Sequence, residues 1–326
     1  MMIRRRLGTW ALVAAGMLAV GAAAAQNWPS RPVRMIVPFA AGGPSDVVGR
    51  EVAARLQEQL GQPVLVDIRA GANSTIGAAL AAKASPDGHT LLIGSVGTFA
   101  INMVTYKDLQ YDSLRDFDLL SLSARTPNVL VSSAKLPAGT VKEIVALLQA
   151  NPGKHTFGVA GMGSSGHLTS ELFLLRTKTK AIIVPFKGAG AAMGDLIGGQ
   201  VDLTFTSLGS AAPHIRGGRL RALGLTSGKR IAQFPDVPTL TELGYRDMEI
   251  YSWQAFAAPR GLQKDVRNRL ENALIAVVTS GAGRTNLENL GWEVVGSSGA
   301  QFRDTLVREI ALWREVVRSA NITIDP

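Results

Sequence analysis

Two glycine-rich turns carry the residues of this chain that are best suited to hold a ligand. The first spans residues 39–46 (FAAGGPSD) and the second spans residues 161–167 (GMGSSGH). Each turn follows a strand-like run and opens a helix-like run, so backbone N–H groups lie unpaired beside the positive end of a helix dipole. Such turns suit an anion, and two of them far apart in sequence predict a ligand held from both sides.

Alternating strand and helix patterns position the first turn. Apolar and amphipathic runs predict strands at residues 33–37, 63–68 and 90–93 and helices at residues 46–60 and 74–84. Strands joined by helices form a parallel sheet with helices on its faces, and ligands bind at the carboxyl ends of the strands. The first turn lies at such an end.

The same alternation starts again further along and positions the second turn. Strands are predicted at residues 129–131, 156–160, 182–184 and 201–205, with helices at residues 140–150, from His167 and up to Ile197. Thr140 and Glu143 predict a capping box for the first of these helices. A strand at residues 251–258 and amphipathic helices at residues 263–279 and 300–320 then lead back and should complete the first unit.

The predicted fold class is therefore α/β, with two lobes that each contain a parallel-type sheet. Lobe 1 is expected to comprise residues 26–127 and 251–326, and lobe 2 residues 128–250. Because the chain leaves lobe 1 and returns to it, two crossings near Asn128 and Ile250 are expected to form a hinge.

The first 25 residues have the pattern of an export signal. Arg4, Arg5 and Arg6 precede a short apolar run that ends in alanines before Gln26. The run is short for a membrane span of about 20 residues, and no stop-transfer charges follow it. We expect cleavage after residue 25 and, because the chain has no cysteine, a periplasmic protein without a lipid anchor or disulfides.

The composition disfavours nucleic acid as a partner. The formal net charge is +9, but the basic residues are scattered, and no basic run is interleaved with aromatic residues. An acidic small ligand or an anionic surface fits this charge better. The chain also lacks any cluster of histidines and acidic residues at ligand spacing, so neither a metal nor a cofactor is predicted.

An exported α/β enzyme that acts on a carboxylate or an ester is the alternative hypothesis. The second turn contains the G-x-G-x-x-G pattern of dinucleotide sites, but Phe186 and Lys187 stand where an acidic residue should hold the ribose. Ser164 or Ser165 could be the nucleophile of a hydrolase. However, the G-x-S-x-G spacing is absent, and none of the four histidines lies in a motif that marks a base.

An ordered set of short motifs resembles the substrate-binding receptors of tripartite tricarboxylate transporters, the Bug family. In chain order these are WPSRPVR (28–34), IVPF (36–39), GGPSD (42–46), SPDGHTLL (85–92), PFKG (185–188), GGQVD (198–202), PT (238–239), ELG (242–244), Trp253 and AP (258–259). The resemblance implies a type II periplasmic-binding-protein clamshell that is not an enzyme and needs no cofactor. It implies a monomer that closes on a dicarboxylate, tricarboxylate, aromatic carboxylate or acidic amino acid and delivers it to integral membrane permease subunits.

The resemblance also implies which residues bind the ligand, largely through backbone amides, small hydroxyls and bridging waters. In lobe 1 they are Phe39, Gly43, Ser45, Asp46, Ser95, Thr98 and Asn102, and in lobe 2 they are Ser164, Ser165, His167, Lys187, Gly188, Phe205 and Thr206. Four residues depart from the usual family pattern. Asn73 and Ser74 replace glycines, Phe186 replaces a tyrosine, and Met103 replaces the proline that commonly follows Asn102.

Several of these residues also have a purely structural interpretation. Ser45 and Asp46, like Ser164 and Ser165, could be no more than helix caps and first-turn residues. His167 lies at a helix start, where positive charge is disfavoured, so it is expected to be a neutral hydrogen-bond partner. Lysines in such turns usually face solvent, and Lys187 has that alternative.

Overall fold

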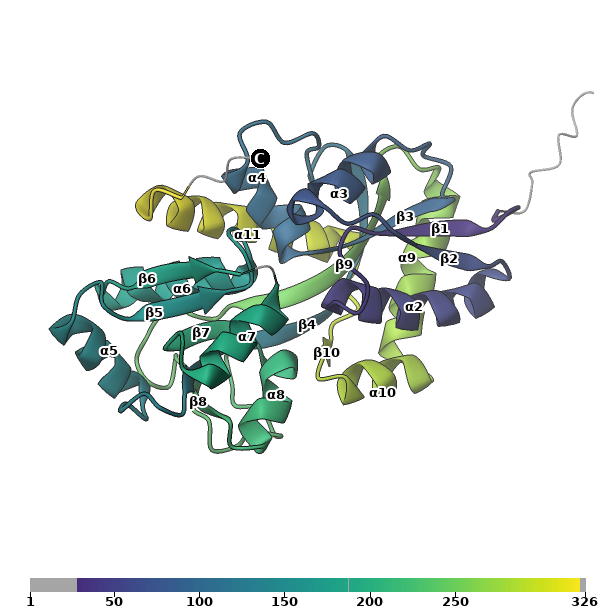
Figure 1. The fold of residues 1–326 in the computed structure, drawn as a ribbon. Helices are drawn as coiled ribbons and strands as arrows, with labels where there is room; N and C mark the ends of the chain where they lie inside the picture. The colour runs from purple at the N-terminus through teal and green to yellow at the C-terminus, as the bar shows by residue number, and fades with distance from the viewer. Residues whose placement is uncertain (1–27, 187, 323–326) are drawn as a thin grey trace, which may run out of the picture.

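The computed structural model describes residues 28–186 and 188–322, and the fold alternates strands and helices as predicted (Figure 1). The expected signal peptide, residues 1–25, and Lys187 lie outside the described residues. The strands are β1 (Val33–Val37), β2 (Val64–Ile68), β3 (Thr90–Ser95), β4 (Phe117–Ser133), β5 (Thr156–Val159), β6 (Ile182–Pro185), β7 (Leu203–Ser207), β8 (Leu220–Leu225), β9 (Tyr251–Pro259) and β10 (Glu293–Val294).

Helices cover the strands in both halves of the molecule (Figure 1). They are α2 (Pro44–Leu60), η1 (Ala72–Ser74), α3 (Thr75–Ala82), η2 (Gly97–Ile101), α4 (Asn102–Thr105), α5 (Val141–Ala150), α6 (Ser165–Thr177), α7 (Ala189–Gly198), α8 (Leu208–Arg216), α9 (Lys264–Thr279), α10 (Gly281–Asn289) and α11 (Gly299–Ser319). The predicted capping box of α5 is confirmed, because Thr140 and Glu143 each bond the backbone N–H of the other. Within the described residues, no helix has both the length and the apolar character to cross a membrane.

The strands follow the order β2-β1-β3-β9-β4-β7-β5-β6, with β8 and β10 also paired to β4. Strands β1, β2 and β3 pair in parallel, as do β5, β6 and β7. Each half thus contains a parallel group, as predicted. The antiparallel strands β4 and β9 run between the two groups.

Strand β4 is much longer than the three residues predicted and connects the two halves. Residues 117–127 pair with β9, whereas residues 128–133 pair with β7 and β8. The change of partners falls between Pro127 and Asn128. Proline has no N–H to donate to a ladder, so it fits the point at which one pairing ends and the next begins.

Two amphipathic helices show how the predicted apolar stripes are used. Helix α2 buries its stripe and ends at Gly61, whose φ of 71° suits glycine. It begins at Pro44, two residues earlier than predicted, because proline is favoured at the first helical position.

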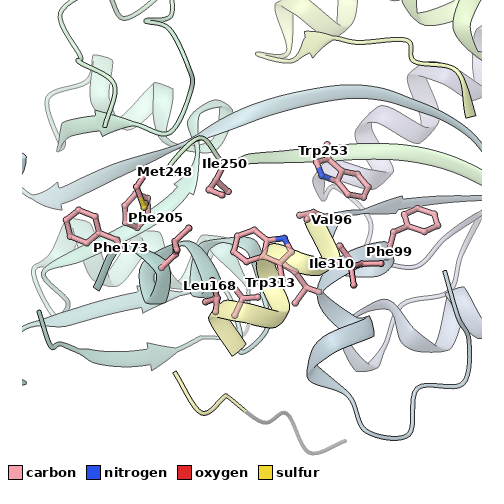
Figure 2. Packing of buried hydrophobic residues seen from close by; sticks show 14 of the residues in the cluster. Val96, Phe99, Leu168, Phe173, Phe205, Met248, Ile250, Trp253, Ile310 and Trp313 are labelled. Carbon is pink, nitrogen blue, oxygen red and sulfur yellow. The ribbon is translucent and has the colours of Figure 1, made fainter. Parts of the chain in front are cut away.

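Helix α11 buries Phe302, Leu306, Ile310 and Trp313. It packs against β4 and η2, as expected for a helix that completes the first unit, and also against α6. Figure 2 shows Trp313 beside Ile310 and Leu168, in a cluster that continues to Phe173 and Phe205. The hydrophobic core therefore extends from one half of the molecule to the other under α11.

Candidate functional site

A cleft of about 620 Å³ lies between the two halves, and both glycine-rich turns line it. Nine of the predicted site residues line the cleft: Phe39, Gly43, Ser45, Ser95, Ser164, Ser165, Gly188, Phe205 and Thr206. Asp46, Thr98, Asn102 and His167 are buried behind it and are not part of its lining. Lys187 lies outside the described residues, so its role stays a prediction.

The first turn is held by a hydrogen bond between a glycine and the aspartate four residues later. Gly42 has a φ of 79° and donates its N–H to Asp46 Oδ2 at 2.8 Å. Asp46 Oδ1 lies 2.8 Å from Arg50 Nε. Burial alone would raise the pKa of Asp46, but the Gly42 N–H and Arg50 outweigh burial and lower it below its ordinary value. Asp46 therefore stays ionised and shapes the turn.

The second turn repeats this arrangement with a different acceptor. Gly163 has a φ of 74° and donates its N–H to His167 Nδ1 at 3.0 Å. Ser164 caps α6, because its Oγ accepts the His167 N–H at 3.2 Å. Since Nδ1 is an acceptor, the proton of a neutral His167 is on Nε2, which lies 3.7 Å from Glu171 Oε1. His167 is fully buried and serves as a structural partner.

Each turn leaves two backbone donors unpaired within the described residues. At the start of α2 these are the N–H groups of Ser45 and Asp46, since Pro44 has none. At the start of α6 they are the N–H groups of Ser165 and Gly166. The first turn of a helix leaves backbone N–H groups without intrahelical partners, and these lie at the positive end of the helix dipole. The cleft is therefore suited to a negatively charged ligand.

Close packing fixes the position of the second turn. A Cβ atom on Gly166 would lie 2.3 Å from the carbonyl oxygen of Phe205, so only glycine fits between α6 and β7. Gly188, at the start of α7, has a φ of 107° and donates its N–H to the Ala160 carbonyl at 3.0 Å. Glycines thus bring the backbones of three segments of the second half together at the cleft.

Sequence reasoning missed two buried polar residues on the strands between the halves. Gln254 on β9 is 1% exposed, lines the cleft and accepts a 2.7 Å hydrogen bond from Ser45 Oγ through its Oε1. Asn128 on β4 also lines the cleft, and its Nδ2 lies 3.1 Å from both Ser165 Oγ and Thr169 Oγ1. The available signal was an amide side chain inside each of these strands, because a buried amide requires hydrogen-bond partners.

The cleft offers neutral donors and acceptors. None of its lining residues in the described part of the chain carries a formal charge. Hydroxyls, side-chain amides and backbone N–H groups can hold an ionised carboxylate through charge-assisted hydrogen bonds. In residues 28–186 and 188–322, no group of three or more His, Asp or Glu side chains could hold a metal.

The two serines of the second turn are bonded as structural groups. Ser164 Oγ accepts the His167 N–H, and Ser165 Oγ accepts from Asn128 Nδ2. Within the described residues, no histidine ring nitrogen is hydrogen-bonded to either hydroxyl. This geometry differs from that of an activated serine nucleophile, in which a base holds the hydroxyl proton.

The two-lobed fold with a cleft between its halves defines a solute-binding protein of the periplasmic class. Residues 48–322 match the family described as "Tripartite tricarboxylate transporter family receptor". The chain is 37% identical over 295 residues to Protein BugT of Bordetella pertussis, an alignment that covers 90% of each chain.

Solved structures agree with this assignment. Rpa4515 of R. palustris with adipate is 35% identical, with a TM-score of 0.83 over 91% of this chain and 99% of that chain. MatC of Rhodopseudomonas palustris with bound malate is 31% identical, with a TM-score of 0.80 over 89% of this chain and 100% of that chain. The chain belongs to the tripartite tricarboxylate transporter receptor family, as its motifs predicted, and is a solute-binding receptor.

Proposed function

We propose that this receptor captures a small carboxylate between its two lobes and delivers it to the membrane permease of a tripartite tricarboxylate transporter. The observation that carries the proposal is the pair of matched turns, each with two unpaired N–H groups beside one uncharged cleft. The related structures with adipate and malate support a carboxylate ligand. The receptor acts as a monomer in the periplasm after its signal peptide is removed, and it catalyses no reaction.

The lobes are residues 26–127 with 251–326, and residues 128–250. The switch of β4 from β9 to β7 and β8 between Pro127 and Asn128 supports this division. Tyr251, where β9 begins, is the register partner of Pro127. Both crossings therefore lie side by side, as a hinge requires.

The hydrogen-bond donors that line the cleft are numerous enough for micromolar affinity. A micromolar ligand requires about 8 kcal/mol of binding free energy. Three to five charge-assisted hydrogen bonds at roughly 1.5–3 kcal/mol each can supply it after the entropy cost of association. The unpaired amides of both turns, together with Ser95 and Gln254, provide that many groups.

The proposal is tested by thermal shift and calorimetry on the mature protein. The panel should contain dicarboxylates, tricarboxylates, aromatic carboxylates and acidic amino acids, with NAD and a simple ester as comparators. We expect a carboxylate to raise the melting temperature and to bind with one-to-one stoichiometry. Stabilisation by NAD or by the ester, with none from any carboxylate, would instead support the enzyme hypothesis.

Size, processing and closure are tested on the same protein. Light scattering should give the mass of one mature chain, and mass spectrometry of periplasmic extracts should give an N-terminus at Gln26. Small-angle scattering should show a smaller radius of gyration when the ligand is added. A dimer would contradict the proposed monomer, and a retained leader would contradict the proposed cleavage. An unchanged radius of gyration would contradict closure on the ligand.

A further inference from the structure

We propose that Asn73 determines ligand specificity, and that its carboxamide oxygen accepts a hydrogen bond from a hydroxyl group of the ligand. The inference rests on the proposed carboxylate-binding function and adds the substituent that the carboxylate carries. Asn73 lies in the segment between β2 and α3, lines the cleft and is half-buried.

The backbone around Asn73 has an unusual conformation. Ala72, Asn73 and Ser74 have φ values of 42°, 48° and 76°, so three consecutive residues other than glycine are left-handed. This conformation costs about 1–2 kcal/mol per residue relative to the ordinary one. It persists where surrounding contacts impose it, and such residues concentrate at functional sites. The segment therefore holds one particular side chain, that of Asn73, at the edge of the cleft.

A buried side chain, Asn102, imposes this conformation. Its Nδ2 donates to the Asn73 carbonyl at 2.8 Å, and its Oδ1 accepts from Asn73 Nδ2 at 3.0 Å. The same Nδ2 lies 3.3 Å from Ser74 Oγ and 3.2 Å from Tyr111 Oη. Asn102 is fully buried. Asn102 is thus a positioning residue, which acts on the ligand through Asn73.

The network continues to a second segment of the cleft. Tyr111 Oη donates to the Thr98 carbonyl, and Thr98 Oγ1 accepts the Ser95 N–H at 3.3 Å. Ser95, like Asn73, lines the cleft from the first half of the molecule. Thr98 and Asn102 are therefore both set behind the cleft, where they orient the residues that line it.

The hydrogen bonds also determine which atom Asn73 offers to a ligand. A backbone carbonyl can only accept, so Asn102 must present Nδ2 to it and Oδ1 to Asn73. Asn73 must then present its own Nδ2 to Asn102. The carboxamide oxygen of Asn73 has no hydrogen-bond partner within the described residues. A ligand that displaces water from this oxygen must supply a donor, and an ionised carboxylate has none.

A hydroxyl group is the donor that fits best. An ammonium group in the cleft would be costly without a counter-charge, and the described lining residues include no carboxylate. A hydroxyl is neutral, donates one hydrogen bond and can accept another from the remaining Asn73 N–H or from Ser95 Oγ. The ligand class is therefore a hydroxycarboxylate.

The test is calorimetry with pairs of carboxylates that differ only in one hydroxyl, such as succinate with malate, glutarate with 2-hydroxyglutarate, and 3-phenylpropionate with 3-phenyllactate. We expect the wild-type protein to bind the hydroxylated member of at least one pair roughly tenfold more tightly, as one satisfied hydrogen bond allows. Asn73→Gly also removes the hydrogen bond to Asn102 Oδ1, so it should weaken both members of the pair. It should weaken the hydroxylated member more, which reduces the preference to less than about threefold.

Ala72→Gly is the matched control. It adds a glycine to the same left-handed segment, but Ala72 does not line the cleft, so the hydroxyl preference should remain. Asn73→Asp should weaken both members of the pair, because it adds a negative charge beside the ligand carboxylate. A preference that survives in Asn73→Gly, or disappears equally in Ala72→Gly, would overturn the role of Asn73. Wild-type binding without any hydroxyl preference would overturn the inference alone, and no binding of any carboxylate would overturn the proposed function with it.

Discussion

The two turns that face each other across the cleft have the same backbone geometry but different chemistry. In both, a glycine with φ near 75° donates its N–H to the side chain four residues later, and two further N–H groups stay unpaired. The acceptor is the charged Asp46 in the first turn and the uncharged His167 in the second. The first turn is exposed at Gly42, whereas the second is packed tightly at Gly166. The same turn geometry is thus stabilised by an ion pair in the first turn and by close packing in the second turn.

Gly166→Ala should have the largest effect, because it breaks the close-packed turn. The added Cβ would meet the Phe205 carbonyl at 2.3 Å, so α6 or β7 must move. We expect a loss of about 2–4 kcal/mol in the free energy of unfolding and, by calorimetry, at least roughly a thirtyfold loss of ligand affinity. The control is Gly194→Ala in α7, which has open space around it and should be neutral or slightly stabilising.

A well-folded Gly166→Ala protein with wild-type affinity would show that close packing does not set the second turn. The corresponding position in the first turn is Ser45, where a side chain is present. The comparison therefore predicts that Ser45→Gly is tolerated far better than Gly166→Ser, as urea unfolding can measure.

His167→Ala should have the next largest effect. It leaves the buried Gly163 N–H without an acceptor and creates a cavity in a fully buried site. The expected cost is about 3 kcal/mol of stability, from the unpaired donor and the lost packing. His167→Gln supplies a side-chain oxygen that can accept the N–H and should recover part of the loss in thermal unfolding. Equal destabilisation by both variants would argue that only the volume of His167 matters.

Acidification should break the first turn through Asp46. The folded-state pKa of Asp46 is lowered by the Gly42 N–H and Arg50 despite burial. A lowered carboxyl pKa stabilises the protein above the unfolded-state value, near pH 4, and this contribution is lost as the pH falls further. Asp46→Asn keeps an acceptor for Gly42 but cannot titrate. The wild-type protein should therefore lose more stability than Asp46→Asn as the pH falls below 4, measured by urea unfolding as a function of pH. Parallel pH curves for the two proteins would contradict this role.

The double variant Ser45→Ala and Ser164→Ala should have only a small effect on ligand affinity. The first change removes the hydrogen bond to Gln254 Oε1, and the second removes the cap of α6. Each should cost about 1 kcal/mol of stability, and the affinity should fall several-fold while the fold survives. Unchanged affinity in calorimetry would mean that only backbone amides contact the ligand from these turns.

The elements that sequence patterns predict well are those with local causes. The apolar stripe of α2 and the capping box of α5 depend on residues within a few turns of each other, and both were predicted. The long β4 was missed outside residues 129–131, because its partners β9 and β7 are distant in sequence. Helices α8 and α10 and strand β8 were also missed, since α8 contains Pro213 and α10 is polar and short.

The backbone turns that line the cleft could be predicted from the sequence, whereas the positions of several side chains could not. Glycine-rich turns can be recognised from composition alone. Both turns and Gly188 were therefore predicted, and all of them line the cleft. Asp46, His167, Thr98 and Asn102 were assigned to the ligand, but the structure buries them behind the residues that line the cleft. Which side of a turn a side chain takes depends on partners such as Arg50 and Tyr111, and no local pattern specifies those contacts.

We propose that both turns hold one carboxylate at the same time. The most direct measurement is calorimetric titration of a tight-binding carboxylate into the wild-type protein, Ser45→Pro and Gly166→Ala. Ser45→Pro removes one unpaired N–H of the first turn, and Gly166→Ala displaces the second turn. We expect one-to-one binding by the wild type and a loss of affinity of roughly tenfold or more in each folded variant. Full affinity in either folded variant would contradict a ligand held from both sides.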